Sequence, residues 1–116
     1  MKTKIGILSM IIAALMSIVS IASAAPLHNE TATFKVYGNC DMCKKRIESA
    51  LLKNENIQSA SWDVKTKMIT VVYNPHMISL DVIHKIIADV GHDTDKLSAE
   101  DSTYNKLMGC CQYKRK

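Results

Sequence analysis

Apolar and polar residues alternate in three separate stretches of the chain, which is the pattern of strands that bury one face. The first stretch lies between Thr31 and Tyr37, and the other two lie on either side of a turn at 65–67. The alternating apolar residues are Ala32, Phe34 and Val36, then Ala60, Trp62 and Val64, and finally Ile69, Val71 and Tyr73. Pro75 ends the third strand, because proline has no N–H to donate to a sheet.

Two further stretches repeat their apolar residues with the period of a helix. The first begins at Cys43 and fades at 54–56, and the second is closed by Gly91, a residue type that commonly ends helices. The apolar faces consist of Cys43, Ile47, Ala50 and Leu51 in the first helix and of Ile83, Ile86, Ile87 and Val90 in the second. A short, weak strand is expected at 96–99.

The order of these elements predicts an α+β fold of the ferredoxin-like βαββαβ type. We expect a four-stranded antiparallel sheet with both helices on one face, formed by residues 31–99, with Trp62 and Ile83 in the packing. A short cysteine-containing tail follows at 100–116. In this topology the loop before the first helix and the loop after the second lie at the same end of the sheet.

The N-terminus has the composition of a secretory signal peptide. Lys2 and Lys4 precede an apolar run at 5–21, and small residues follow at 22–24. We expect residues 1–24 to be removed, with cleavage after Ala24. A retained membrane anchor is the alternative, but the apolar run is at the short end for spanning a bilayer. The mature protein is therefore expected to be periplasmic or secreted, without membrane anchoring.

Removal of that segment would leave 92 of the 116 residues, which is one small domain. The loss of Lys2 and Lys4 lowers the formal net charge from +4 to +2. So small a positive charge argues against nucleic acid as a partner. The sequence does not define an oligomeric state.

The four cysteines are not spaced as a disulfide framework, although exported cysteines usually pair. Cys40 and Cys43 form a CxxC motif at the start of the first helix. The unpaired N–H groups of a helix start favour a thiolate over a thiol. Two thiolates suit soft ions such as Cu(I) or Hg(II), whereas structural zinc takes four ligands. An inert disulfide between the two cysteines is the alternative.

From about residue 31 to residue 99, the chain resembles the heavy-metal-associated domain of copper chaperones, copper-transporting P-type ATPases and the periplasmic mercury-binding protein. The resemblance rests on the CxxC after the first strand, on "TVVYNP" at 70–75 and on "VGH" at 90–92. It implies that Cys40 and Cys43 bind the metal. It also places His92 near the metal, where the family has an aromatic residue, so His92 is a tentative third ligand. The alternative is that His92 only forms a hydrogen bond.

The family's loop usually reads Gly-Met-Thr-Cys, and its methionine plugs the core. The corresponding residues here are Tyr37, Gly38, Asn39 and Cys40, so that methionine is missing. Met42, between the two cysteines, is expected either to fill the space or to flank the metal.

The adjacent cysteines Cys110 and Cys111 lie outside the family pattern. Neighbouring cysteines rarely pair with each other, because the ring would be strained. We consider them tentative metal ligands, either for a second soft-metal site or as additions to the first. A disulfide to Cys40 or Cys43, or an incidental presence, are the alternatives. The tail carries few apolar residues, so its ordering is expected to be costly.

Together these features predict an exported metal-binding protein and not an enzyme. It would bind a soft ion, Cu(I) or Hg(II) first and Zn(II) or Cd(II) less readily, and pass it to a metal transporter or efflux protein. A thiol–disulfide oxidoreductase is the alternative from another class, because such enzymes also have CxxC at a helix start. A metal scavenger without a transfer partner is the third possibility.

Overall fold

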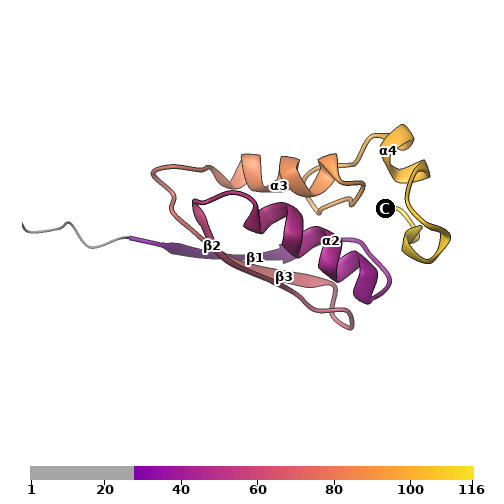
Figure 1. Ribbon diagram of the computed structural model, residues 1–116, viewed down its shortest axis with the longest axis horizontal. Coiled ribbons are helices and arrows are strands. Elements are labelled where there is room, and N and C mark those ends of the chain that lie inside the picture. Colours follow the sequence, from indigo (N-terminus) through magenta and orange to yellow (C-terminus); the bar gives the residue numbers. More distant parts are fainter. Residues whose placement is uncertain (1–27) are drawn as a thin grey trace, which may run out of the picture.

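The computed structural model describes residues 28–116 (Figure 1). The expected signal peptide at 1–24 and its cleavage after Ala24 lie outside the described residues. Among the helices of residues 28–116, none is both long enough and apolar enough to cross a bilayer.

Three antiparallel strands form the sheet, in the spatial order β1-β3-β2. They are β1 (Glu30–Lys35), β2 (Ile57–Trp62) and β3 (Met68–Tyr73). Ile69 of β3 lies opposite Phe34 of β1 and Trp62 of β2. All three side chains are buried, so this register places apolar residues of every strand on one face of the sheet. The three strands expected from the alternating pattern are thus confirmed.

Two helices, α2 (Asp41–Leu52) and α3 (Leu80–Asp89), cover this face of the sheet (Figure 1). The carboxylate of Glu48 on α2 accepts a hydrogen bond from the Trp62 N–H at 2.8 Å, which fixes α2 over β2. The imidazole of His84 on α3 stacks on Phe34, with ring centroids 4.0 Å apart, which fixes α3 over β1. Ile83 is fully buried between the layers. The predicted helices and their arrangement on one face are confirmed.

The prediction of a short, weak fourth strand at 96–99 is wrong, because the sheet of residues 28–116 has three strands. Within the described residues, the segment beside β1 makes only an isolated bridge, between Val36 and Thr94. The hydroxyl of Thr94 accepts a hydrogen bond from the Leu97 N–H at 2.9 Å, and the Thr94 N–H donates to the Leu97 carbonyl at 2.7 Å. These two bonds occupy the backbone N–H and carbonyl of Leu97, which would otherwise be available to pair with β1. The chain therefore turns away from β1. The ferredoxin-like fold therefore has a three-stranded sheet here.

Trp62 fills the space beneath the cysteine-containing loop. Its indole N–H donates to the carbonyls of Val36, at 3.0 Å, and Lys67, at 3.2 Å. A Cβ atom at Gly38 would lie 3.0 Å from the Trp62 ring. A larger residue at this position would crowd the buried indole, so glycine suits this close approach of the loop to Trp62.

The tail is well anchored, which contradicts the expectation that it has few apolar anchors. It contains α4 (Asp101–Asn105) and the 3₁₀ turn η1 (Gly109–Cys111), and it folds back toward the start of α2 (Figure 1). Leu107 and Tyr113 are 8% and 3% exposed. Gly91 has a φ of 101°, and a Cβ atom there would lie 3.0 Å from Leu107. The helix-ending glycine thus also provides the surface on which the tail packs.

The hydroxyl of Tyr113 joins the tail to the loop after α3. It donates to the Gly91 carbonyl at 2.8 Å and accepts from the Asp93 N–H at 2.8 Å. We predict that Tyr113→Phe lowers the free energy of unfolding by about 1–3 kcal/mol, because it leaves buried backbone groups without partners. Urea denaturation measures the effect.

The control for this prediction is Tyr37→Phe. Tyr37 is half-buried with its ring 6.3 Å from that of Tyr113, but its hydroxyl makes no hydrogen bond to residues 28–116. Equal losses of stability in the two variants would show that the Tyr113 hydroxyl does not hold the tail.

Candidate metal centre

Cys40 and Cys43 lie at the corner between β1 and α2. Cys40 is the N-cap residue of α2 and has an extended backbone, with φ −148°. Its carbonyl accepts the first helical hydrogen bond, from the Lys44 N–H at 3.1 Å. Cys43 lies in the first turn, and the two sulfur atoms are 3.8 Å apart. The CxxC motif therefore places two sulfur atoms together at the start of a helix.

The two thiols of this motif have different surroundings. The backbone N–H groups of Cys43 and Met42 lower the pKa of Cys40, as expected at a helix start. Burial instead raises the pKa of Cys43 to about 11, although the Asn39 N–H donates to its sulfur at 3.4 Å. At neutral pH Cys40 is therefore the more reactive thiol. Cys43 is therefore protonated at neutral pH in the absence of a metal, and metal binding would displace its proton.

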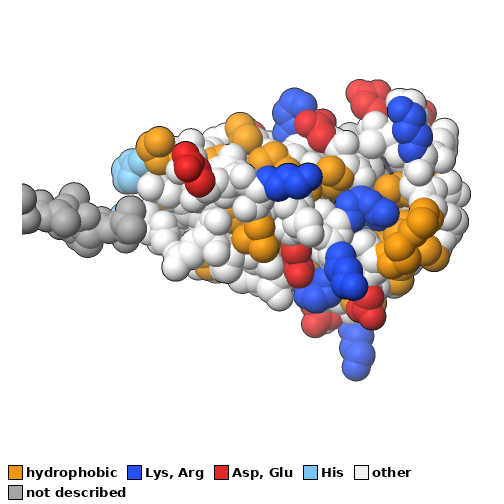
Figure 2. Space-filling model, viewed as in Figure 1, with side chains coloured by type: hydrophobic (Ala, Val, Ile, Leu, Met, Phe, Trp, Pro, Cys, Tyr) orange, Lys and Arg blue, Asp and Glu red, His pale blue; other side chains and the backbone are white. Residues whose placement is uncertain are grey.

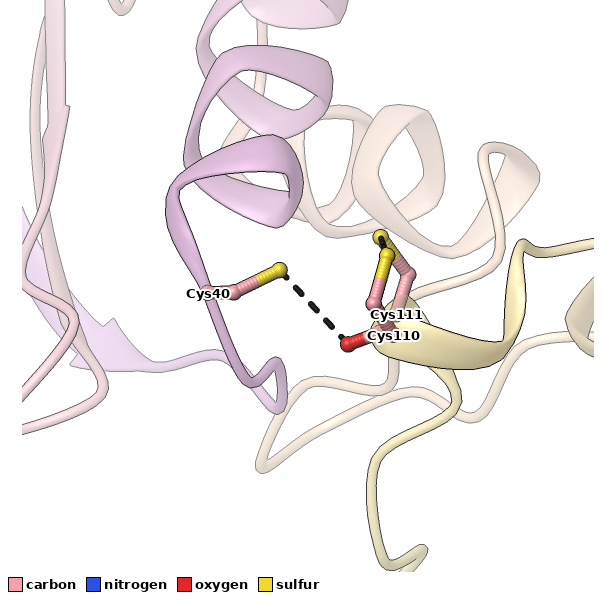
Figure 3. Close-up of side chains that lie close together, drawn as sticks. All are labelled: Cys40, Cys110 and Cys111. Carbon is pink, nitrogen blue, oxygen red and sulfur yellow. Dashed lines mark hydrogen bonds between the residues drawn. The ribbon is translucent and has the colours of Figure 1, made fainter.

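The tail cysteines lie directly across from Cys40 (Figure 3). The Cys40 thiol donates to the Cys110 carbonyl at 3.5 Å, and the Cys110 and Cys111 sulfur atoms are 3.9 Å apart. The sulfur atoms of Cys40, Cys110 and Cys111 all lie within 4.8 Å of one another. The tail pair thus adjoins the CxxC motif and does not form a separate site. All four cysteines are free thiols.

The structure does not bring His92 into this group. His92 is fully buried, its Nδ1–H donates to the Tyr37 carbonyl at 2.8 Å, and its ring stacks on Tyr113 with centroids 5.4 Å apart. Its Nε2 has no hydrogen-bond partner among residues 28–116. Burial lowers the pKa of His92, so the imidazole is neutral. This is the geometry of a hydrogen-bonding core residue, which was the alternative to a ligand role for His92.

Met42 flanks the sulfur group and does not fill the core. Its side chain is 45% exposed, and its thioether sulfur lies 3.8 Å from the Cys110 sulfur. Met108, before the tail cysteines, is also exposed. In Figure 2 hydrophobic side chains gather at the end of the molecule that carries the tail. The rim of the candidate centre is therefore apolar, and it includes thioether sulfur, which is a soft ligand.

Sequence reasoning missed the residues that hold the tail in place, above all Tyr113, Asp93 and Arg115. The Arg115 guanidinium binds the buried Asp93 carboxylate through two nitrogens, at 3.1 and 2.8 Å. Burial acts to raise the pKa of Asp93, but Arg115 and the Ala99 N–H outweigh it and lower that pKa. An aromatic residue and an arginine just after the cysteine pair were the only signal of this anchor in the sequence.

Comparison with known proteins matches residues 33–93 to the heavy-metal-associated domain. The chain is 33% identical over 55 residues to the copper chaperone CopZ of Staphylococcus haemolyticus, covering 47% of this chain and 81% of the chaperone. It is 35% identical over 82 residues to a copper-exporting P-type ATPase of Staphylococcus saprophyticus. That match covers 68% of this chain but spans only 10% of the ATPase.

Solved structures share the fold. The Cu(I)-loaded N-terminal domain of a potential copper-translocating P-type ATPase from Bacillus subtilis is 29% identical, with a TM-score of 0.56. The match covers 66% of this chain and 96% of that domain. Oxidised MerP from Ralstonia metallidurans CH34 is 23% identical, with a TM-score of 0.55, covering 59% of this chain and 96% of MerP; it supports the fold alone.

The domain match ends before the tail cysteines, but it includes both cysteines of the corner and the loop that ends at Asp93. The sequence motifs, the order of the elements and these matches agree. The chain therefore belongs to the heavy-metal-associated domain family.

Proposed function

We propose that this protein is an exported carrier for a soft metal ion of the copper or mercury class. It binds the ion through Cys40 and Cys43 and passes it to a metal transporter or efflux protein. The observation that carries the proposal is the convergence of sulfur atoms at the start of α2, with Cys40 and Cys43 3.8 Å apart and the tail thiols beside them. In this role the protein is a carrier and not an enzyme.

The donor set favours Cu(I) as the cargo. Thiolate and thioether sulfur are soft ligands, which select Cu(I) over the harder divalent ions. Copper chaperones and copper-exporting ATPases among the relatives support the same choice. Hg(II) is the second candidate, and Zn(II) and Cd(II) follow.

Transfer to a partner requires sulfur atoms that the partner can reach. Cys110 is exposed and Cys40 is partly exposed, so a partner's thiolates can attack the bound ion while Cys43 still holds it. Such exchange moves the ion without releasing it to solvent. A transporter or efflux protein is the expected partner, because part of a copper-exporting ATPase resembles this chain. Export is proposed from the signal-peptide pattern at 1–24.

A thiol–disulfide oxidoreductase is the second candidate, and one observation favours it. Cys40 is the accessible thiol with the lower pKa, whereas Cys43 is buried with a raised pKa, as in a pair of attacking and resolving cysteines. Thioredoxin-like enzymes also place a cis-proline against the motif. Residues 28–116 contain no cis peptide bond, so this part of such a centre is not found in them.

The proposed function predicts how the corner cysteines affect metal binding. We expect that Cys40→Ser combined with Cys43→Ser abolishes tight binding of one Cu(I), because the corner then lacks both of its thiolates. Competition with a Cu(I) chelator under anaerobic, reducing conditions measures the affinity.

The matched control is Met77→Leu. It removes an exposed sulfur from the loop between β3 and α3, at the opposite end of the domain, and should leave the affinity unchanged. Full-strength Cu(I) binding by the double cysteine variant would refute the proposed centre.

A separate prediction concerns the oxidoreductase alternative. The reduced protein should reduce insulin disulfides only at the background rate, because the described residues lack the cis-proline expected of such a centre. Turbidity of precipitating insulin measures the rate. Catalytic turnover that disappears in Cys40→Ser would favour the oxidoreductase over the carrier.

A further inference from the structure

The tail pair, Cys110 and Cys111, repeats the arrangement of the corner pair, Cys40 and Cys43. In each pair the first thiol is accessible and the second is fully buried. The two sulfur atoms are 3.8 Å apart in the corner pair and 3.9 Å apart in the tail pair. With a metal–sulfur bond of about 2.3 Å, as for zinc, two thiolates on opposite sides of one ion are about 4.6 Å apart. Each pair is therefore already close enough to hold an ion of its own.

Four thiols are more than one soft monovalent ion needs. Two thiolates suit Cu(I), so an ion on the corner pair leaves the tail pair unused. Four thiolates around one Cu(I) would leave three negative charges uncompensated beside buried sulfur atoms, which is costly. Two ions on two pairs leave a single uncompensated charge for each ion. The charge balance therefore favours a second ion over two further ligands for the first.

The Cys40 sulfur connects the two pairs. It is 3.8 Å from the Cys43 sulfur, and it lies within 4.8 Å of both tail sulfurs (Figure 3). A thiolate has more than one lone pair, so this sulfur can contact an ion in each pair. On the tail side, the Met42 thioether lies 3.8 Å from the Cys110 sulfur and adds a soft donor. Two ions would thus share one centre.

The chain itself fixes the tail pair, on both sides of η1. Before the turn, Leu107 packs against Gly91. After it, the ring of Tyr113 stacks on His92, with centroids 5.4 Å apart. Cys111, between these anchors, is fully buried. The tail thiols therefore lie beside the corner pair without a metal to draw them there.

An ion pair locks the end of the tail. Asp93 is 1% exposed at its side chain, and the Arg115 guanidinium that binds it also donates to the Ala99 carbonyl at 2.5 Å. A two-nitrogen contact to a buried carboxylate holds its geometry better than an exposed ion pair does. Arg115 thus acts as a positioning residue, which reaches the sulfur group only through the tail backbone.

We propose that the tail pair binds a second soft ion, beside the ion held by the corner pair, and that the Cys40 thiolate contacts both ions. The inference rests on the proposed soft-metal binding and extends it from one ion to two. As the second ion binds, metal–sulfur bonds form to Cys110 and Cys111, their two S–H bonds break and two protons pass to solvent. The oxidation state of the ion does not change.

The number of bound ions tests the proposal, with Cu(I) as the probe. Competition with a Cu(I) chelator under anaerobic, reducing conditions should show two Cu(I) per full chain, and native mass spectrometry should find both in a single chain. Cys110→Ser combined with Cys111→Ser should lower the number to one, because the second ion loses both of its own thiolates. The matched control, Met77→Leu, removes an exposed sulfur at the opposite end of the domain and should keep two.

A single substitution guards against a folding defect at the buried Cys111. Cys110→Ser alone changes an exposed side chain and should weaken binding of the second ion by about 100-fold, because a tethered ligand is lost. Circular dichroism verifies that each variant is folded. Binding of both ions with wild-type affinity in Cys110→Ser would overturn the proposal.

X-ray absorption at the copper edge tests the shared sulfur. In the chain loaded with two equivalents of Cu(I), each copper should have the other within about 4.6 Å, which is twice the metal–sulfur bond length. The tail double variant should show sulfur neighbours without a copper neighbour. A doubly loaded wild-type chain without a copper–copper distance would overturn the contact of Cys40 with both ions.

The anchor is tested by the rate at which the second ion is released to a chelator. Arg115→Gln should speed that release several-fold, because the tail leaves the centre more often. Lys114→Gln removes the same charge from an exposed neighbour and should leave the rate unchanged. Equal release rates in Arg115→Gln and the wild-type protein would overturn the role of the anchor.

The outcomes separate this inference from the proposed function. A wild-type protein without tight Cu(I) binding refutes the function itself. One tightly bound Cu(I) and no second leaves the function standing and overturns the inference. Two ions that persist in the tail double variant, or a second ion found only between two chains, would also overturn it.

Discussion

The buried indole of Trp62 is the contact on which the whole metal corner depends. Its N–H donates to two carbonyls, at the end of β1 and in the turn before β3. Its ring supports the loop at Gly38, and its backbone N–H binds Glu48 on α2. One side chain thus connects the strand that precedes the cysteines, the loop that carries them and the helix that follows. The position of Cys40 is set by packing beneath it.

The tail shows how burial outweighs the entropic cost of ordering a chain end. Fixing each residue costs about 1–2 kcal/mol. Leu107, Cys111 and Tyr113 offset that cost by burying apolar surface, and the Tyr113 hydroxyl satisfies two backbone groups that would otherwise be buried without partners. The ion pair with Asp93 then holds the end of the chain. Two cysteines outside the domain match thus come to lie beside Cys40.

Desolvation and the helix start act in opposite directions on the two corner thiols. Cys40 lies outside the core, so the N–H groups of the first turn dominate and lower its pKa. Cys43 points into the core, so burial dominates and raises its pKa. The same helix end therefore yields one reactive and one protected sulfur. That asymmetry suits the proposed metal binding, in which Cys40 meets the ion first and Cys43 loses its proton once the ion is present.

The sequence by itself determined the three strands, the two helices and the CxxC at the helix start, because each depends on periodicity or on residues close together in the chain. It could not determine where the sheet ends. There, hydrogen bonds between Thr94 and Leu97 compete with pairing to β1, and they turn the chain away. Only the tertiary structure decided the positions of Cys111 and His92. Both depend on Tyr113 packing against a loop 20 residues away in sequence, and no local pattern records such a contact.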